Sequence, residues 1–167
     1  MINIRAQKTA EDIAAIHAVN NKAFDRHGET AAFDEFRESR NDIVSLVATE
    51  DERILGHVLF SPVTLQRANG PASGMGLGQL AVLPEYQRRG IGQLLTRQGL
   101  QQVRKTDCPF VIVVGHASYY PRFGFEPGTN HGIRCQWQGI PDDSFMVLFL
   151  DDKQRPNLTG TAYFDGL

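Results

Sequence analysis

The sequence predicts a mixed α/β fold, with a central mixed β-sheet flanked by helices. Segments of strand length alternate with segments of helical periodicity through the first 150 residues. The run from Phe110 to Gly115 is apolar and rich in β-branched residues, which is typical of a strand buried on both faces of a sheet. We therefore expect a single domain over residues 1–150. Pro, Asn, Gly and Thr dominate residues 151–167, which we expect to form a C-terminal surface tail.

The first helix is predicted from its start signal. Thr9-Ala10-Glu11-Asp12 resembles a capping box and precedes Ile13, Ile16, Asn20 and Phe24, which fall roughly on one helical face. We expect a second short helix from Ala31 to Ser39, anchored by Phe33 and Phe36. The other expected helices run from about Gly90 to Lys105 and near Ser118 to Phe123. The expected strands are Met1 to Arg5, Val44 to Thr49, Ile54 to Leu65 after a hairpin at Glu50-Asp51-Glu52-Arg53, Leu77 to Leu83, Phe110 to Gly115, His131 to Gln136 and Phe145 to Leu150.

Size, charge and cysteine content narrow the class of protein. The chain has 167 residues and a net charge of −2, whereas a general nucleic-acid binder is normally strongly basic. No apolar run approaches the roughly 20 residues that span a bilayer, and the N-terminus lacks the apolar core of a signal peptide. Cys108 and Cys135 match neither a disulfide framework nor a metal site. These features predict a cytoplasmic domain without metal, nucleic-acid or membrane partners.

The segment from Gln87 to Gly92 is the strongest functional signal. It follows the apolar strand Leu80 to Leu83 and Pro84, and it opens a helix. The first amides of a helix have no acceptor within the helix, and the macrodipole makes that end positive. Gly90 and Gly92 allow close approach of a ligand, while the neighbouring Arg88 and Arg89 add charge. The pattern predicts a pyrophosphate site.

Two common phosphate motifs do not fit this segment. A P-loop requires Gly-Lys-Ser/Thr after its glycines, which is absent. Gly76-x-Gly78-x-x-Ala81 has the spacing of a dinucleotide fingerprint, but it runs into a strand that ends at Pro84 and opens no helix. Both alternatives are therefore set aside.

Gln-x-x-Gly-x-Gly after a Leu-Ala-Val strand resembles the acyl-CoA signature of the Gcn5-related N-acetyltransferase (GNAT) superfamily. A second motif supports the resemblance, because Tyr120 stands four residues before Gly124-Phe125, after the next strand. Within the superfamily, the details are similar to the YhbS-type group of N-acetyltransferases. The resemblance implies a splay between two middle strands of the sheet and acetyl-CoA as cofactor, with CoA as product. The cofactor-binding residues that it implies are Leu80, Ala81, Val82, Gln87, Arg88, Arg89, Gly90, Ile91 and Gly92.

The resemblance implies transfer of an acetyl group to a primary amine by direct attack on the thioester. Tyr120 is the expected proton donor to the leaving thiolate. The strand Gly78 to Leu83 contains no carboxylate that could deprotonate the amine. His116 is the nearest titratable candidate by sequence position, since imidazole takes up a proton near neutral pH. Water relayed to Glu29 or Glu50 is an equal alternative.

A non-catalytic acyl-CoA sensor or regulatory module is the alternative function, because it would share the phosphate site. O-acyl transfer or a longer acyl donor is also chemically close. The acceptor is expected to be an amine on a small molecule or peptide. Acidic residues around the second predicted helix could favour a cationic amine: Glu29, Asp34, Glu35 and Glu38. The closing strands could pair between subunits, so a homodimer is possible.

Overall fold

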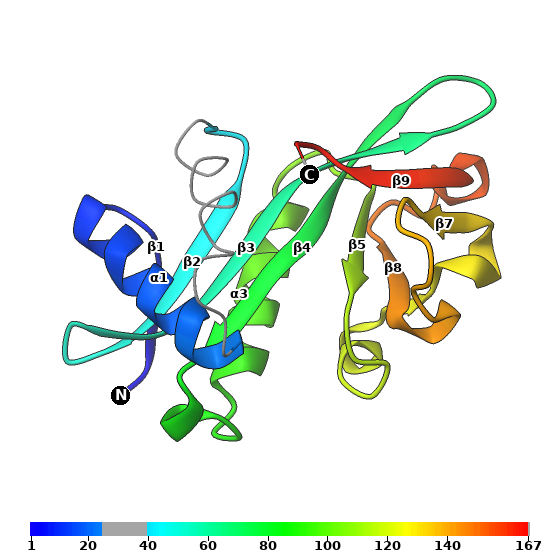
Figure 1. Ribbon diagram of the computed structural model, residues 1–167. Helices are drawn as coiled ribbons and strands as arrows, with labels where there is room; N and C mark the ends of the chain where they lie inside the picture. The colour runs from blue at the N-terminus through cyan, green and yellow to red at the C-terminus, as the bar shows by residue number, and fades with distance from the viewer. Residues whose placement is uncertain (25–39, 167) are drawn as a thin grey trace. The chain divides into compact units, whose positions relative to one another are not determined.

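The computed structural model describes residues 1–24 and 40–166, and Figure 1 shows its elements. The predicted helix from Ala31 to Ser39 and the acidic residues around it lie outside the described residues. The strands are β1 (Asn3–Ala6), β2 (Val44–Glu50), β3 (Arg53–Gln66), β4 (Ala72–Val82), β5 (Phe110–Val114), β6 (Glu126–Pro127), β7 (Ile133–Cys135), β8 (Phe145–Phe149) and β9 (Gly160–Phe164). The α-helices are α1 (Ala10–Phe24) and α3 (Ile91–Arg104). Short 3-10 helices are η1 (Pro84–Tyr86), η2 (Tyr120–Phe123), η3 (Gly128–His131), η4 (Asp142–Ser144) and η5 (Arg155–Asn157).

The strand pairings are mixed. β2 pairs antiparallel with β1 and β3, and β8 pairs antiparallel with β5 and β6. β4 and β5 run parallel, as do β7 and β9. The predicted mixed α/β fold is therefore confirmed.

The chain divides into two compact units, each of which contains part of β3 and part of β4. The first unit comprises Met1–Phe60 and Gln79–Gln102, and the second comprises Ser61–Gly78 and Val103–Leu167. We describe each unit by itself.

In the first unit, α1 and α3 lie on opposite faces of the strands, with α1 in front and α3 behind in Figure 1. Two glycines let α3 and β3 approach closely. A Cβ at Gly56 of β3 would lie 3.0 Å from a Leu95 methyl carbon of α3, and a Cβ at Gly99 of α3 would overlap the Phe60 ring. β2 and β3 are joined by a two-residue turn at Asp51 and Glu52, as expected from the sequence.

The start of α1 confirms the predicted capping box. The Thr9 hydroxyl accepts a hydrogen bond from the Asp12 amide at 3.2 Å, and the Asp12 carboxylate accepts one from the Thr9 amide at 3.4 Å. Arg5 of β1 donates to both oxygens of Asp12, at 2.7 and 2.8 Å. These two bonds are the main reason that the pKa of the Asp12 carboxyl lies well below its usual range. The beginning of α1 is thus fixed to β1.

The second unit is organised around β5. Every residue of β5 from Phe110 to Val113 is buried, as the apolar run predicted. Within this unit, Met75 to Leu77 of β4 are in parallel register with Val111 to Val113 of β5. The buried cluster of this unit consists of Val63, Leu65, Phe110, Ile112, Ile133, Phe145, Val147, Leu158, Ala162 and Phe164.

The expectation of a surface tail from residue 151 onward is wrong. β9 pairs antiparallel with β3 and parallel with β7. Leu158, Ala162 and Phe164 are buried in the cluster of the second unit. The Pro- and Gly-rich composition marks the turns around η5 and β9, while the short alternating strand contributes to the core.

Among the residues that the structure describes, no helix is long and apolar enough to cross a membrane.

Candidate functional site

The exposed loop between β4 and α3 contains the predicted phosphate residues. Gln87, Arg88, Arg89 and Gly90 are all exposed. Arg88 and Gly90 have left-handed backbone conformations, with φ of 61° and 82°. Alternation between right- and left-handed residues turns successive amides toward one side, which forms a concave anion-binding site.

The amides of this loop are available to a ligand. Within residues 1–24 and 40–166, no backbone carbonyl accepts a hydrogen bond from the amides between Arg88 and Gln93. The Leu94 amide donates to the Gly90 carbonyl at 3.0 Å and closes the first turn of α3. The loop therefore offers several unpaired donors at the positive end of a 14-residue helix.

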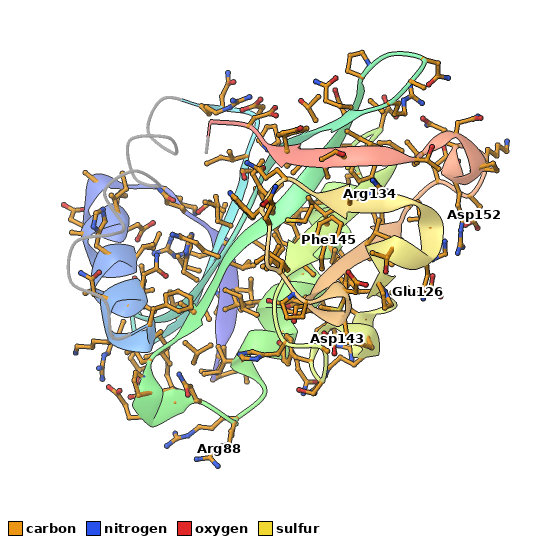
Figure 2. All side chains as sticks on the ribbon, turned by 45° about the vertical axis from the view of Figure 1, so that its right-hand side comes forward. Arg88, Glu126, Arg134, Asp143, Phe145 and Asp152 are labelled. Atoms are coloured by element: carbon orange, nitrogen blue, oxygen red, sulfur yellow. The ribbon has the colours of Figure 1, made fainter. Side chains whose placement is uncertain are left out.

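The Tyr86 ring contacts the side chains of two nearby arginines. The Arg89 guanidinium lies 5.1 Å from the Tyr86 ring centroid, and that of Arg53 from β3 lies 5.4 Å from it. Arg53 also pairs with Glu85 at 3.2 Å. Arg88 instead extends away from the ribbon, as Figure 2 shows. Two arginines are thus held beside the loop, and the side chain of the third extends outward.

Gln87 ties the loop to the end of β4. Its side-chain Nε2 donates to the Val82 carbonyl at 3.0 Å. The Leu83 amide donates to the Leu55 carbonyl at 2.8 Å, which fixes the strand end against β3. This bond gives Gln87 a structural role, and its predicted contact with the cofactor stays a prediction.

The predicted acyl-arm residues lie at the end of β4. Leu80 is half-buried, whereas Ala81 and Val82 are buried, with exposed fractions of 2% and 9%. All three residues belong to β4. Their contact with an acyl arm stays a prediction.

Tyr120 is a buried side chain of the second unit. Its ring packs edge-on against Tyr119 at 5.0 Å and Phe125 at 5.7 Å between centroids. A Cβ at Gly115 would overlap the Tyr120 ring, so Gly115 provides the surface on which the ring lies. Burial, with a smaller contribution from Tyr119, raises the pKa of Tyr120 above its usual range. Within the described chain, no hydrogen bond to the Tyr120 hydroxyl is found.

His116 reaches Tyr120 through its backbone. The His116 carbonyl accepts hydrogen bonds from the amides of Tyr119 at 3.0 Å and Tyr120 at 3.4 Å. Its side chain is exposed. The structure thus makes His116 part of the turn that holds Tyr120, and its role as a base stays a prediction.

The described residues contain no group of three or more His, Cys, Asp or Glu side chains that could hold a metal ion. Cys108 and Cys135 are free and half-buried. Burial raises the pKa of both thiols. Neither thiol is therefore activated as a nucleophile.

Sequence reasoning gave no role to three features of these units. The Tyr86 ring contacts two arginine guanidinium groups, and Gly115 packs directly against the Tyr120 ring. In the interior of the first unit, Asn20 donates a hydrogen bond to Gln79 at 3.0 Å. Asn20 carried a signal, since it is a polar residue on the apolar face predicted for α1. The other two depend on contacts that only the fold reveals.

Comparison with known proteins assigns the family. The acetyltransferase (GNAT) domain family matches residues 3–128. The uncharacterized N-acetyltransferase YhbS of Escherichia coli K12 is 32% identical over 154 residues, which cover 92% of this chain and 90% of that protein.

Two crystal structures resemble the fold. That of YhbS from Escherichia coli in complex with CoA has a TM-score of 0.88 and 30% identity, covering 98% of this chain and 89% of the other. The structure of a GNAT family acetyltransferase from Brucella melitensis in complex with acetyl-CoA has a TM-score of 0.75 and 29% identity. The match covers 99% of this chain and 97% of the other. The chain belongs to the GNAT acetyltransferase family.

Proposed function

We propose that this protein transfers an acetyl group from acetyl-CoA to the nitrogen of a primary amine by direct attack on the thioester. The observation that carries the proposal is the exposed loop from Gln87 to Gly90, with its unpaired amides at the start of α3. Family membership supports acyl transfer as the reaction, and the relatives bound to CoA and acetyl-CoA support the donor.

The loop fits the diphosphate of a CoA molecule. Acetyl-CoA supplies an acyl group activated as a thioester. The amides from Arg88 to Gly92 and the guanidinium groups of Arg88 and Arg89 hold the diphosphate in this proposal. At Gly90 a Cβ would meet no atom within 4 Å, so the approach to the backbone is open. Backbone groups of Leu80 and Val82 hold the pantetheine arm.

Tyr120 assists the departure of the thiolate. The amine nitrogen bonds to the acyl carbon, the C–S bond breaks, the amine loses one proton and the sulfur gains one. A phenol has an ordinary pKa of about 10 and a thiol one of about 8.5, and burial raises the pKa of Tyr120 further. Complete proton transfer from Tyr120 is therefore uphill. Its hydroxyl acts by donating a hydrogen bond to the developing thiolate, which then takes its proton from solvent.

The amine must arrive without its extra proton or lose it on the protein. β4 contains no Asp or Glu, and the His116 side chain is exposed on the turn before η2. A neutral amine taken directly from solution satisfies the chemistry with no dedicated base. His116 and a relayed water are the two alternatives.

Release of CoA tests the proposal. Free thiol is followed after acetyl-CoA is mixed with the protein and, in turn, alanine amide, lysine amide, tyramine, spermidine and glucosamine. Amine-dependent thiol release, with the acetylated amine identified by mass spectrometry, is the expected result. Acetyl-CoA binding without amine-dependent release would contradict it and favour the non-catalytic acyl-CoA sensor.

A further inference from the structure

A buried pair of carboxamides joins α1 to β4 in the first unit. Asn20 Nδ2 donates to Gln79 Oε1 at 3.0 Å, and the two residues are only 1% and 7% exposed. The neighbouring inward residues of α1, Ile16 and Val19, are apolar, as is Ala81 on β4. The pair is thus a polar contact between two elements whose neighbouring buried residues are apolar.

The pair leaves one buried hydrogen-bonding atom without a partner. Asn20 Oδ1 is buried and, within residues 1–24 and 40–166, accepts no hydrogen bond. A buried polar atom left without a partner typically costs about 1–3 kcal/mol, and such atoms are rare in folded proteins. A pair of apolar side chains of matching shape would avoid that cost, so hydrogen bonding alone does not explain why this pair is stable.

The position of the pair connects it to the proposed acyl-transfer site. Gln79 directly precedes Leu80 on β4, where the backbone is proposed to hold the acyl arm. Asn20 is held beside this stretch of β4 by its bond to Gln79. The unpaired carbonyl oxygen of Asn20 therefore lies next to the strand that is proposed to present the thioester.

We infer that Asn20 Oδ1 accepts a hydrogen bond from the N–H of the incoming primary amine, and that Gln79 is a positioning residue that holds Asn20 in this orientation. The inference rests on the proposed function. An amide oxygen accepts an N–H but carries no charge, so it binds an amine in its neutral form without taking up a proton. A neutral amine held by one N–H keeps its lone pair available for the acyl carbon.

Four variants test the inference: Asn20→Leu, Gln79→Leu, the double variant, and Asn21→Leu as a control on the same helix. The amine among alanine amide, lysine amide, tyramine, spermidine and glucosamine that gives the fastest CoA release is used throughout. We measure kcat, the KM of the amine, the KM of acetyl-CoA and the unfolding midpoint. We expect Asn20→Leu to lower kcat/KM for the amine about tenfold, consistent with loss of one hydrogen bond. The KM of acetyl-CoA is expected to stay unchanged.

Stability separates this role from a structural one. The double variant is expected to have an unfolding midpoint equal to or higher than that of the unaltered protein, although its kcat/KM for the amine is lower. Gln79→Leu is expected to lower kcat/KM for the amine less than Asn20→Leu does. Asn21→Leu is expected to leave kcat/KM for the amine within twofold of the unaltered value.

An unchanged kcat/KM in Asn20→Leu would overturn the inference, as would a parallel rise in the KM of acetyl-CoA or loss of folding in the double variant. In those cases the unaltered protein still releases CoA, so only the inference fails. If the unaltered protein binds acetyl-CoA but releases no CoA with any amine, the proposed function fails and the inference fails with it.

Discussion

The β4–α3 loop and the turn that carries Tyr120 differ in their exposure and in the kind of hydrogen-bond donor that they present. The loop is exposed and offers backbone amides, and its shape depends on the φ angles of Arg88 and Gly90. Tyr120 is buried and offers one side-chain hydroxyl, and its position depends on packing against Gly115 and Phe125. In the proposed function, binding of acetyl-CoA would therefore follow from local backbone conformation, whereas assistance to the leaving thiolate would follow from tertiary packing. Substitutions in the two regions should therefore separate binding from turnover.

Tyr120→Phe should have the largest effect. Removing the hydroxyl should lower kcat roughly 100-fold, because the developing thiolate then loses the hydrogen bond that stabilises it in the transition state. The dissociation constant of acetyl-CoA should stay unchanged. Steady-state kinetics and calorimetric titration check both parts, with Tyr163→Phe on the exposed side of β9 as the control. A kcat within threefold of the unaltered value would remove Tyr120 from the mechanism.

Gly90→Val should weaken acetyl-CoA binding about tenfold. A left-handed conformation costs a residue with a Cβ about 1–2 kcal/mol, and Val is among the least tolerant residues there. Gly90→Asn is the matched comparison, since Asn adopts this conformation more readily and the surrounding space is open. Calorimetric titration of both variants with acetyl-CoA measures the difference. Equal affinities for the two variants would show that the loop conformation does not govern binding.

Gly115→Ala should reduce kcat several-fold while acetyl-CoA binding persists. The added methyl group overlaps the Tyr120 ring and moves the hydroxyl. A double-mutant cycle with Tyr120→Phe provides the test, because Gly115→Ala should have little further effect once the hydroxyl is absent. If the two losses in kcat simply multiply, Gly115 does not act through Tyr120.

The pH dependence of kcat should show the smallest change. Because the pKa of Tyr120 is raised, the protonated phenol is retained through its ordinary pKa of about 10 and is lost only at higher pH. The Tyr120 contribution should therefore produce no falling limb in kcat below about pH 10. A stopped assay of CoA formation between pH 6 and 10 measures the profile. A decline centred near pH 8 or 9 that disappears in Tyr120→Phe would contradict the assignment.

The features that the sequence predicted well are local ones. The strand, turn and helix around Gln87 to Gly92 are set by consecutive residues, and so is the capping box at Thr9 and Asp12. The spacing of Tyr120 before Gly124 placed the tyrosine after β5, but its burial and raised pKa arise from Phe125, Tyr119 and Gly115 around it.

The features that the sequence did not predict depend on contacts between residues far apart in the chain. Asn20 is visible in the sequence as a polar residue on an apolar helical face, but its partner lies 59 residues away and is not identified by the local pattern. β9 was interpreted as a tail because Pro and Gly surround it, although buried Ala162 and Phe164 alternate with exposed Tyr163. A short strand of this kind is recognisable only when β3 and β7 are known to flank it.

Thermal unfolding with and without nucleotide ligands tests the central claim that the β4–α3 loop belongs to an acyl-CoA site. Acetyl-CoA, CoA, NAD and ATP are each added to the unaltered protein at about 100 times a plausible dissociation constant, which adds about 2.7 kcal/mol of stability for a native-state ligand. We predict a rise of roughly 5–10 °C with acetyl-CoA and CoA but none with NAD. No shift with either CoA ligand, or a larger shift with NAD, would contradict the account.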